Sequence, residues 1–272
     1  MLRYRWSRQR SLTWEFRLHR GPGSCPSDRV QAMLQFPSPT IPKQLWTFLG
    51  LTGCCRIWIP NCGLIAQPLY ESLKGQNDSI LLVWETPQKK VEATLKQNLT
   101  QAPALRLPDP EKAFQLYVHK NKGIDLGVLT QSLGPELQPV AYLSKRFDPT
   151  AQGWHPCLQN LAAIAVLIED ALKLYFGGKL TMFASHQVKR LLTGRGHLWM
   201  SDQRIFRYQV MLMENPSLTI SSCEVLNPAT RLPTRGLSPL SLLPRNFGPL
   251  DKTLRWIVRR TSDQSWGNLV HW

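Results

Sequence analysis

Apolar and polar residues alternate along Phe114 to His119, with Phe114, Leu116 and Val118 separated by Gln115 and Tyr117. A period of two is typical of a strand with one buried face. Asparagine and glycine tolerate the positive φ of tight turns, so residues 121–123 predict a turn directly after this strand. The same reasoning predicts two more strands joined by turns, over residues 126–130 and 139–143.

The apolar pattern changes to a helical one after these strands. Between Leu161 and Ile168 the chain is apolar almost all round, so the helix predicted over residues 158–175 should be buried on more than one side. Further strands are predicted over residues 180–183 and 218–221, with helices over 186–192 and 202–213.

Four helices are predicted before the first strand. Ser27, Thr40 and Thr86 have side chains suited to N-caps, and Pro42 and Pro87 suit a first helical turn. The corresponding helices span residues 28–35, about 40–52, about 64–73 and 88–100.

Three hairpin-linked strands followed by a helix, a strand and another helix is the order of an RNase H-like fold. The words TQAPALRLPDPEKAFQLYV, GVLTQSLGP, PVAYLSKRFDPTAQGW, LAAIAVL and LNPATRLP resemble the connection domain of a gammaretrovirus-type reverse transcriptase, as found in endogenous proviruses. The earlier run FLGLTGCCRIWIPNCGLIAQPLYESLKG resembles the helical thumb of the same family.

The resemblance implies an α/β fold in which a mixed five-stranded sheet with helices follows a small helical thumb-like segment. We expect an unstructured basic start over residues 1–20 and the thumb-like segment over 21–75. The RNase H-like connection domain is expected over 80–226 and an irregular tail over 227–272. Residues 1–13 and those after Gly236 match nothing in the family, which a frameshift or splice would explain.

The formal net charge of +15 favours polyanionic partners, nucleic acid first. About two thirds of this excess lies in residues 1–20 and 235–272, which are the segments least expected to fold. In the family, the thumb lies against the primer–template duplex, so four residues are candidate nucleic-acid contacts: Lys43, Arg56, Lys145 and Arg146. The alternative is that these side chains are ordinary solvated surface charges.

An active RNase H needs acidic side chains that hold two Mg²⁺ ions about 4 Å apart. The resemblance places the three acid positions at His119, Asn160 and Ser185, and none of these is an acid. Glu169 is half a turn away from Asn160 around the helix, and Asp125 and Asp148 lie across turns. We therefore expect no nuclease activity, no bound metal and no cofactor.

Polymerase chemistry is not expected either, because the sequence lacks the YxDD-type acid pair of the polymerase palm, which would precede residue 14. The six cysteines form no CxxC pair and are interpreted as free thiols of a reducing compartment. The chain shows no secretory signal and no membrane span, which favours a cytoplasmic or nuclear location.

The predicted function is therefore non-catalytic: a part of a polymerase polyprotein that binds RNA–DNA hybrid or duplex weakly and without sequence preference. Two alternatives stay open. One is reverse transcriptase or RNase H activity inherited from the family. The other is a protein-interaction module, with a polymerase subunit or host protein as partner, or a proviral relic without selected function.

Overall fold

The computed structural model describes residues 23–75, 81–82, 84–147, 149–151, 153–175, 177–184, 192, 200–222 and 227–230. The predicted basic start and most of the tail lie outside the described residues, as do the linker at 76–79 and nearly all of the helix predicted over 186–192. No helix among the described residues is long and apolar enough to cross a bilayer.

A helical segment comes first along the chain. It contains α1 (Ser27–Gln35), α2 (Pro42–Cys54), the short 3-10 helix η1 (Arg56–Trp58), α3 (Cys62–Ser72) and α4 (Thr86–Thr100). Met33, Leu45, Phe48, Leu69 and Leu95 are fully buried where these helices meet. The apolar stripes of the sequence are therefore the faces that form this core.

The predicted N-caps are wrong in detail. Each cap residue is one position away from the prediction: Pro26, Ile41 and Glu85 occupy the cap positions, and none of them makes a side-chain cap hydrogen bond. Thr40 instead donates from its hydroxyl to the side chain of Gln44 at 3.0 Å. Proline in the first turn of α2 and α4 needs no hydrogen-bond partner for its nitrogen, which offsets the missing cap.

The five-stranded mixed sheet that the sequence predicts is confirmed, with strand order β3-β2-β1-β4-β5. Pairing is antiparallel for β1–β2 and β2–β3, and parallel for β1–β4 and β4–β5. The predicted turn joins the first hairpin, where Lys122 and Gly123 have φ of 46° and 74°. The strands are β1 (Phe114–Asn121), β2 (Ile124–Leu133), β3 (Glu136–Arg146), β4 (Leu180–Ala184) and β5 (Leu218–Ser222).

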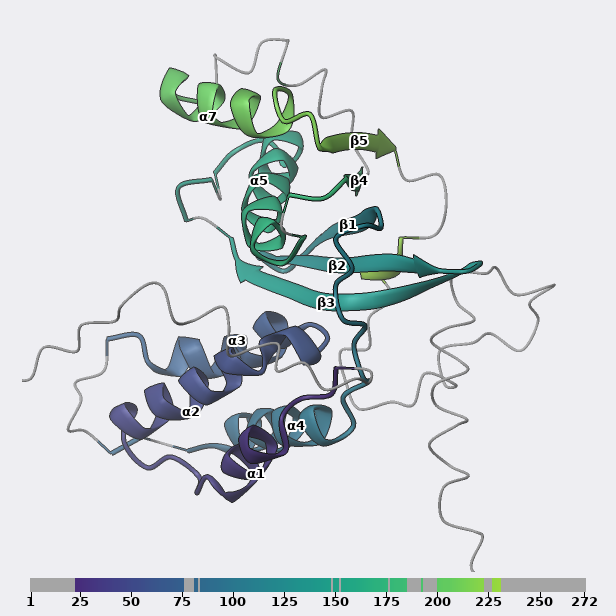
Figure 1. Ribbon diagram of the computed structural model, residues 1–272. Helices are drawn as coiled ribbons and strands as arrows, with labels where there is room; N and C mark the ends of the chain where they lie inside the picture. The colour runs from purple at the N-terminus through teal and green to yellow at the C-terminus, as the bar shows by residue number, and fades with distance from the viewer. Residues whose placement is uncertain are drawn as a thin grey trace, which may run out of the picture.

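The long helix α5 (Pro156–Tyr175) covers one face of the sheet, and α7 (Asp202–Leu212) packs beside it (Figure 1). Gly127 of β2 leaves room for α5, because a Cβ there would meet Leu167 at 3.4 Å. On the opposite face, η4 (Pro228–Thr230) contacts β1 and β2, and the Asn227 side chain donates to the Val118 carbonyl at 2.8 Å. The apolar run in α5 is buried on more than one side, as predicted.

The helical segment lies against the β3 edge of the sheet (Figure 1). The Gly63 N–H of α3 donates to the Ser144 hydroxyl of β3 at 2.8 Å. Gly23 and Leu105 exchange backbone hydrogen bonds of 2.7 and 3.0 Å, which ties the start of the helical segment to the link before β1. One continuous hydrophobic core runs from Met33 to Ala229 through both parts.

Candidate nucleic-acid interface

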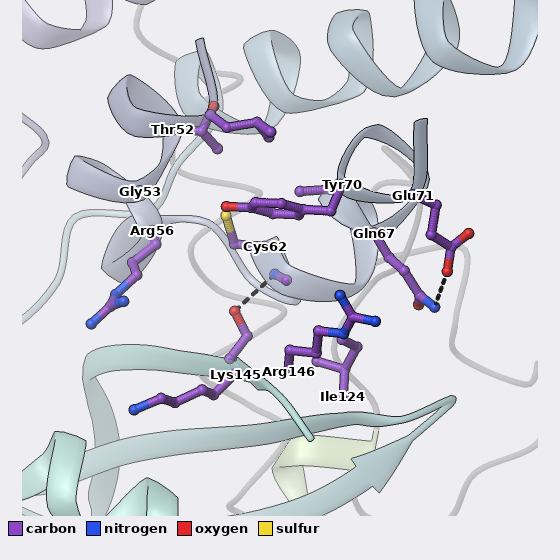
Figure 2. A pocket seen from close by; sticks show the side chains of 14 residues that line it. Thr52, Gly53, Arg56, Cys62, Gln67, Tyr70, Glu71, Ile124, Lys145 and Arg146 are labelled. Atoms are coloured by element: carbon purple, nitrogen blue, oxygen red, sulfur yellow. Dashed lines mark hydrogen bonds between the residues drawn. The ribbon is translucent and has the colours of Figure 1, made fainter. Parts of the chain in front are cut away.

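A groove of about 240 Å³ separates α2, η1 and α3 from the end of β3. Arg56, Lys145 and Arg146 line it together with Tyr70 and Gly53 (Figure 2). Three of the four predicted contact residues therefore line the same groove, although Arg56 is far from Lys145 and Arg146 in the sequence. We call these three side chains the basic groove cluster.

Local structure explains how each cation reaches the groove. Arg56 opens η1, directly after the C-terminus of α2. Lys145 and Arg146 are the last two residues of β3, the edge strand that packs against η1 and α3, so both lie beside the groove. Lys43 is exposed in the first turn of α2 and does not line the groove.

Two of the three cations also contact a buried carboxylate. Asp170 of α5 is 6% exposed, and its oxygens lie 3.7 Å from Arg56, 3.7 Å from Lys145 and 2.7 Å from Lys173. Burial alone would raise the pKa of this carboxyl, but the hydrogen bond from Lys173 and the other two cations outweigh it, so the pKa is lowered. Asp170 thus fixes the groove cations while leaving Arg56 and Lys145 almost half exposed.

Sequence reasoning missed an exposed aromatic pair beside the groove. Trp46 of α2 and Tyr70 of α3 pack edge to face with ring centroids 6.2 Å apart, and their exposed fractions are 53% and 38%. Large exposed aromatic rings offer stacking or apolar contact to a bound partner. The sequence signal for this exposed ring was that Trp46 follows Lys43 by three residues, which places both on the same side of one helix.

The two degenerate acid positions that the structure describes, His119 and Asn160, do not lie together. His119 is near the end of β1, and its neighbour Lys120 donates to Gln159 of α5. Strand alternation therefore places His119 on the face away from α5, whereas Asn160 belongs to α5. Burial lowers the pKa of His119. Ser185 lies outside the described residues.

Asp125 of β2, which the sequence analysis considered only as a substitute metal ligand, is a second buried carboxylate. It is 1% exposed, and among the described residues neither carboxylate oxygen has a hydrogen-bond partner. It pairs across the hairpin with Lys120 and, on the other side, with Lys145. Burial raises the pKa of Asp125 to about 7, although the Lys120 charge lowers it.

A bound metal ion would need several ligating side chains close together. Within the described ranges, no three His, Cys, Asp or Glu side chains gather in a group that could hold a metal ion. Glu169, the acid nearest to Asn160 along α5, pairs instead with Arg207 of α7.

Comparison with known proteins finds that this chain is similar to part of retroviral Gag-Pol polyproteins. Residues 84–182 match the model of the RNase H-like domain found in reverse transcriptase. The chain is 45% identical over 218 residues to the Gag-Pol polyprotein of avian reticuloendotheliosis virus, covering 80% of this chain and 19% of the relative. It is 41% identical over 226 residues to that of gibbon ape leukemia virus, covering 83% and 13%. The chain thus spans a fifth or less of these relatives.

Solved structures of foamy viral protease-reverse transcriptase share the fold. One, in complex with double-stranded DNA, superposes with a TM-score of 0.65 at 19% identity, covering 75% of this chain and 36% of that chain. Another, in complex with an RNA/DNA hybrid, gives a TM-score of 0.64 at 18% identity, covering 83% and 30%.

Proposed function

Because residues 84–182 belong to the family of RNase H-like domains found in reverse transcriptase, within a chain similar to retroviral Gag-Pol, we propose a function in nucleic-acid binding. The chain acts as a non-catalytic module that holds an RNA–DNA hybrid or a DNA duplex through its sugar–phosphate backbone. Binding is weak, independent of sequence and sensitive to salt.

The observation that carries this proposal is the basic groove cluster. Arg56, Lys145 and Arg146 come from two parts of the chain and line one groove (Figure 2). Arginine and lysine neutralise phosphates and release counterions, which supplies affinity without reading bases. The foamy viral structures, which share the fold, are complexes with double-stranded DNA and with an RNA/DNA hybrid.

The non-catalytic part of the proposal rests on the residues at the three acid positions. The side chains of His119, Asn160 and Ser185 carry no negative charge. Two adjacent Mg²⁺ ions need carboxylates to balance their charge. Asp125 does not replace them, because it is enclosed next to Lys120 and its raised pKa leaves it partly protonated near neutral pH.

Binding is tested by the anisotropy of a fluorescent RNA–DNA hybrid at low salt. Arg146 is exposed, so Arg146→Ala should remove a phosphate contact without disturbing the core. We expect about a fivefold loss of affinity, equivalent to roughly 1 kcal/mol. The matched control is Lys89→Ala, an exposed lysine of α4 outside the groove. Equal affinities of the two variants would contradict the proposal that the groove binds nucleic acid.

Catalysis is tested separately with the same hybrid and Mg²⁺. We expect no cleavage by the wild-type chain and none by His119→Asp, because one restored acid does not complete a two-metal site. Mg²⁺-dependent cleavage by the wild-type chain that is abolished by EDTA would support the enzymatic alternative instead.

A further inference from the structure

Two cysteines lie close together at the start of the helical segment. The Cys25 thiol donates to the sulfur of Cys55, with 3.7 Å between the two Sγ atoms and 30 residues between them in the chain. Neither cysteine is in a disulfide. Cys25 is partly buried in the extended stretch before α1, and Cys55 is buried at the C-terminus of α2. The pair therefore joins two parts of the backbone that are 30 residues apart in the chain.

The surroundings keep these two sulfurs in place. Gly23, two residues before Cys25, accepts a 2.9 Å hydrogen bond from the Trp58 indole and pairs with Leu105. Cys55 is fixed from the other side, because its N–H donates to the Thr52 carbonyl at 3.0 Å. Disulfide formation requires the two Sγ atoms, which are 3.7 Å apart, to approach to roughly 2 Å.

We propose that Cys25 and Cys55 form a thiol pair that closes to a disulfide when the chain meets a low-molecular-weight disulfide such as oxidised glutathione. A disulfide would attach the stretch that carries Cys25 covalently to the end of α2. It would cross-link the start of the helical segment, whose Gly23 already pairs with the link before the sheet. The pair is a modification site independent of nucleic-acid binding.

The reaction balances in two exchange steps. The Cys25 thiolate attacks one glutathione sulfur, the glutathione S–S bond breaks, and one glutathione leaves as a thiol. The Cys55 thiolate then attacks Cys25 in the mixed disulfide and releases the second glutathione. Two electrons pass from the cysteine sulfurs to oxidised glutathione, and the two thiol protons end on the released molecules. The hydrogen bond with Cys55 and burial raise the pKa of Cys25, so the reaction should accelerate as pH rises.

The test uses the full chain with Cys54→Ser, because Cys54 is exposed and adjacent to Cys55. The protein is incubated with oxidised glutathione at pH 7 and pH 8.5, alkylated with N-ethylmaleimide, digested without reduction and mapped by mass spectrometry. We expect a peptide pair joining Cys25 to Cys55, lighter by two hydrogens, that forms faster at pH 8.5. The melting temperature should rise by roughly 5 °C or more and fall back after reduction.

Cys25→Ser in the same background should abolish the cross-link and the rise in melting temperature. A cross-link from Cys55 to Cys62, a disulfide between two chains, or Cys25 found wholly alkylated or glutathionylated would each overturn the proposal. The mapping of the Cys54→Ser chain decides the matter even if Cys25→Ser folds poorly, because it needs no substitution at either member of the pair.

Discussion

Two buried carboxylates of this molecule differ sharply in pKa. Asp125 and Asp170 are both nearly inaccessible, yet their pKa values move in opposite directions. Asp170 meets cations from three elements, so its charged form is favoured. Asp125 accepts no hydrogen bond from the part of the chain that the structure describes, so the effect of burial on its pKa dominates. The neighbourhood of each acid, rather than its position in the sequence, therefore sets its contribution to stability.

Asp125 predicts a specific dependence of stability on pH. Its pKa rises from 3.8 to about 7 on folding, so the folded chain keeps a proton that the unfolded chain loses between about pH 4 and pH 7. Stability should therefore fall as pH rises through this window, by up to about 4 kcal/mol at and above pH 7. Asp125→Asn should remove this slope and stabilise the chain at neutral pH.

Urea denaturation at several pH values measures the effect. Asp202→Asn, at an exposed position in the first turn of α7, is the matched control and should retain the wild-type profile. Parallel profiles for the wild-type chain and Asp125→Asn would contradict the assignment of a raised pKa to this carboxyl.

Much of this could be predicted from the sequence at the level of elements. The alternation from Phe114 to His119 and the apolar run from Leu161 to Ile168 located a strand and a helix within a few residues. Caps were not predictable, since Ser27, Thr40 and Thr86 compete with neighbours whose backbone conformation depends on tertiary packing. The basic groove cluster could be proposed only as separate residues, because sequence does not say that η1 packs against β3.

The contact between elements that matters most is the one made by Asp170. It joins η1 of the helical segment, the end of β3 and α5. Asp170→Asn should lower the free energy of unfolding by about 2–3 kcal/mol, below the range for a fully enclosed pair because Arg56 and Lys145 are almost half exposed. The lowered pKa means that this stability is present above about pH 4 and is lost as pH falls below it.

The neighbouring acid provides the comparison. Glu169→Gln breaks the contact with the exposed Arg207, so it should cost less than about 1 kcal/mol. Chemical denaturation of both variants at pH 7 and low salt tests the difference. A loss for Asp170→Asn no larger than that for Glu169→Gln would show that the three-cation contact does not hold the elements together.

At the scale of the whole molecule, the helical segment and the sheet share one hydrophobic core. The boundary predicted near residues 75–80 is a boundary of resemblance, and the hydrophobic core continues across it. The shared core predicts that both parts unfold together. A single calorimetric transition is expected, and limited proteolysis should retain the segment from about residue 23 with the sheet rather than release it.

Two separated transitions, or early release of an intact sheet domain starting near residue 80, would contradict that cooperative unit. Ser144→Ala with Arg56→Ala should shift the system toward two transitions, because it removes the hydrogen bond to Gly63 and the ion pair to Asp170. Thr100→Ala with Lys89→Ala, at two exposed positions of α4, is the matched double substitution and should leave one transition.

The central claim is that this chain holds the phosphate backbone of nucleic acid with the basic groove cluster. Its most direct test is the affinity of the wild-type chain for an RNA–DNA hybrid across a series of salt concentrations, compared with Arg146→Ala. The account predicts that affinity falls steeply and linearly with salt on logarithmic axes, and that Arg146→Ala reduces the slope by about one. An affinity that does not change with salt, or no binding at low salt, would contradict it.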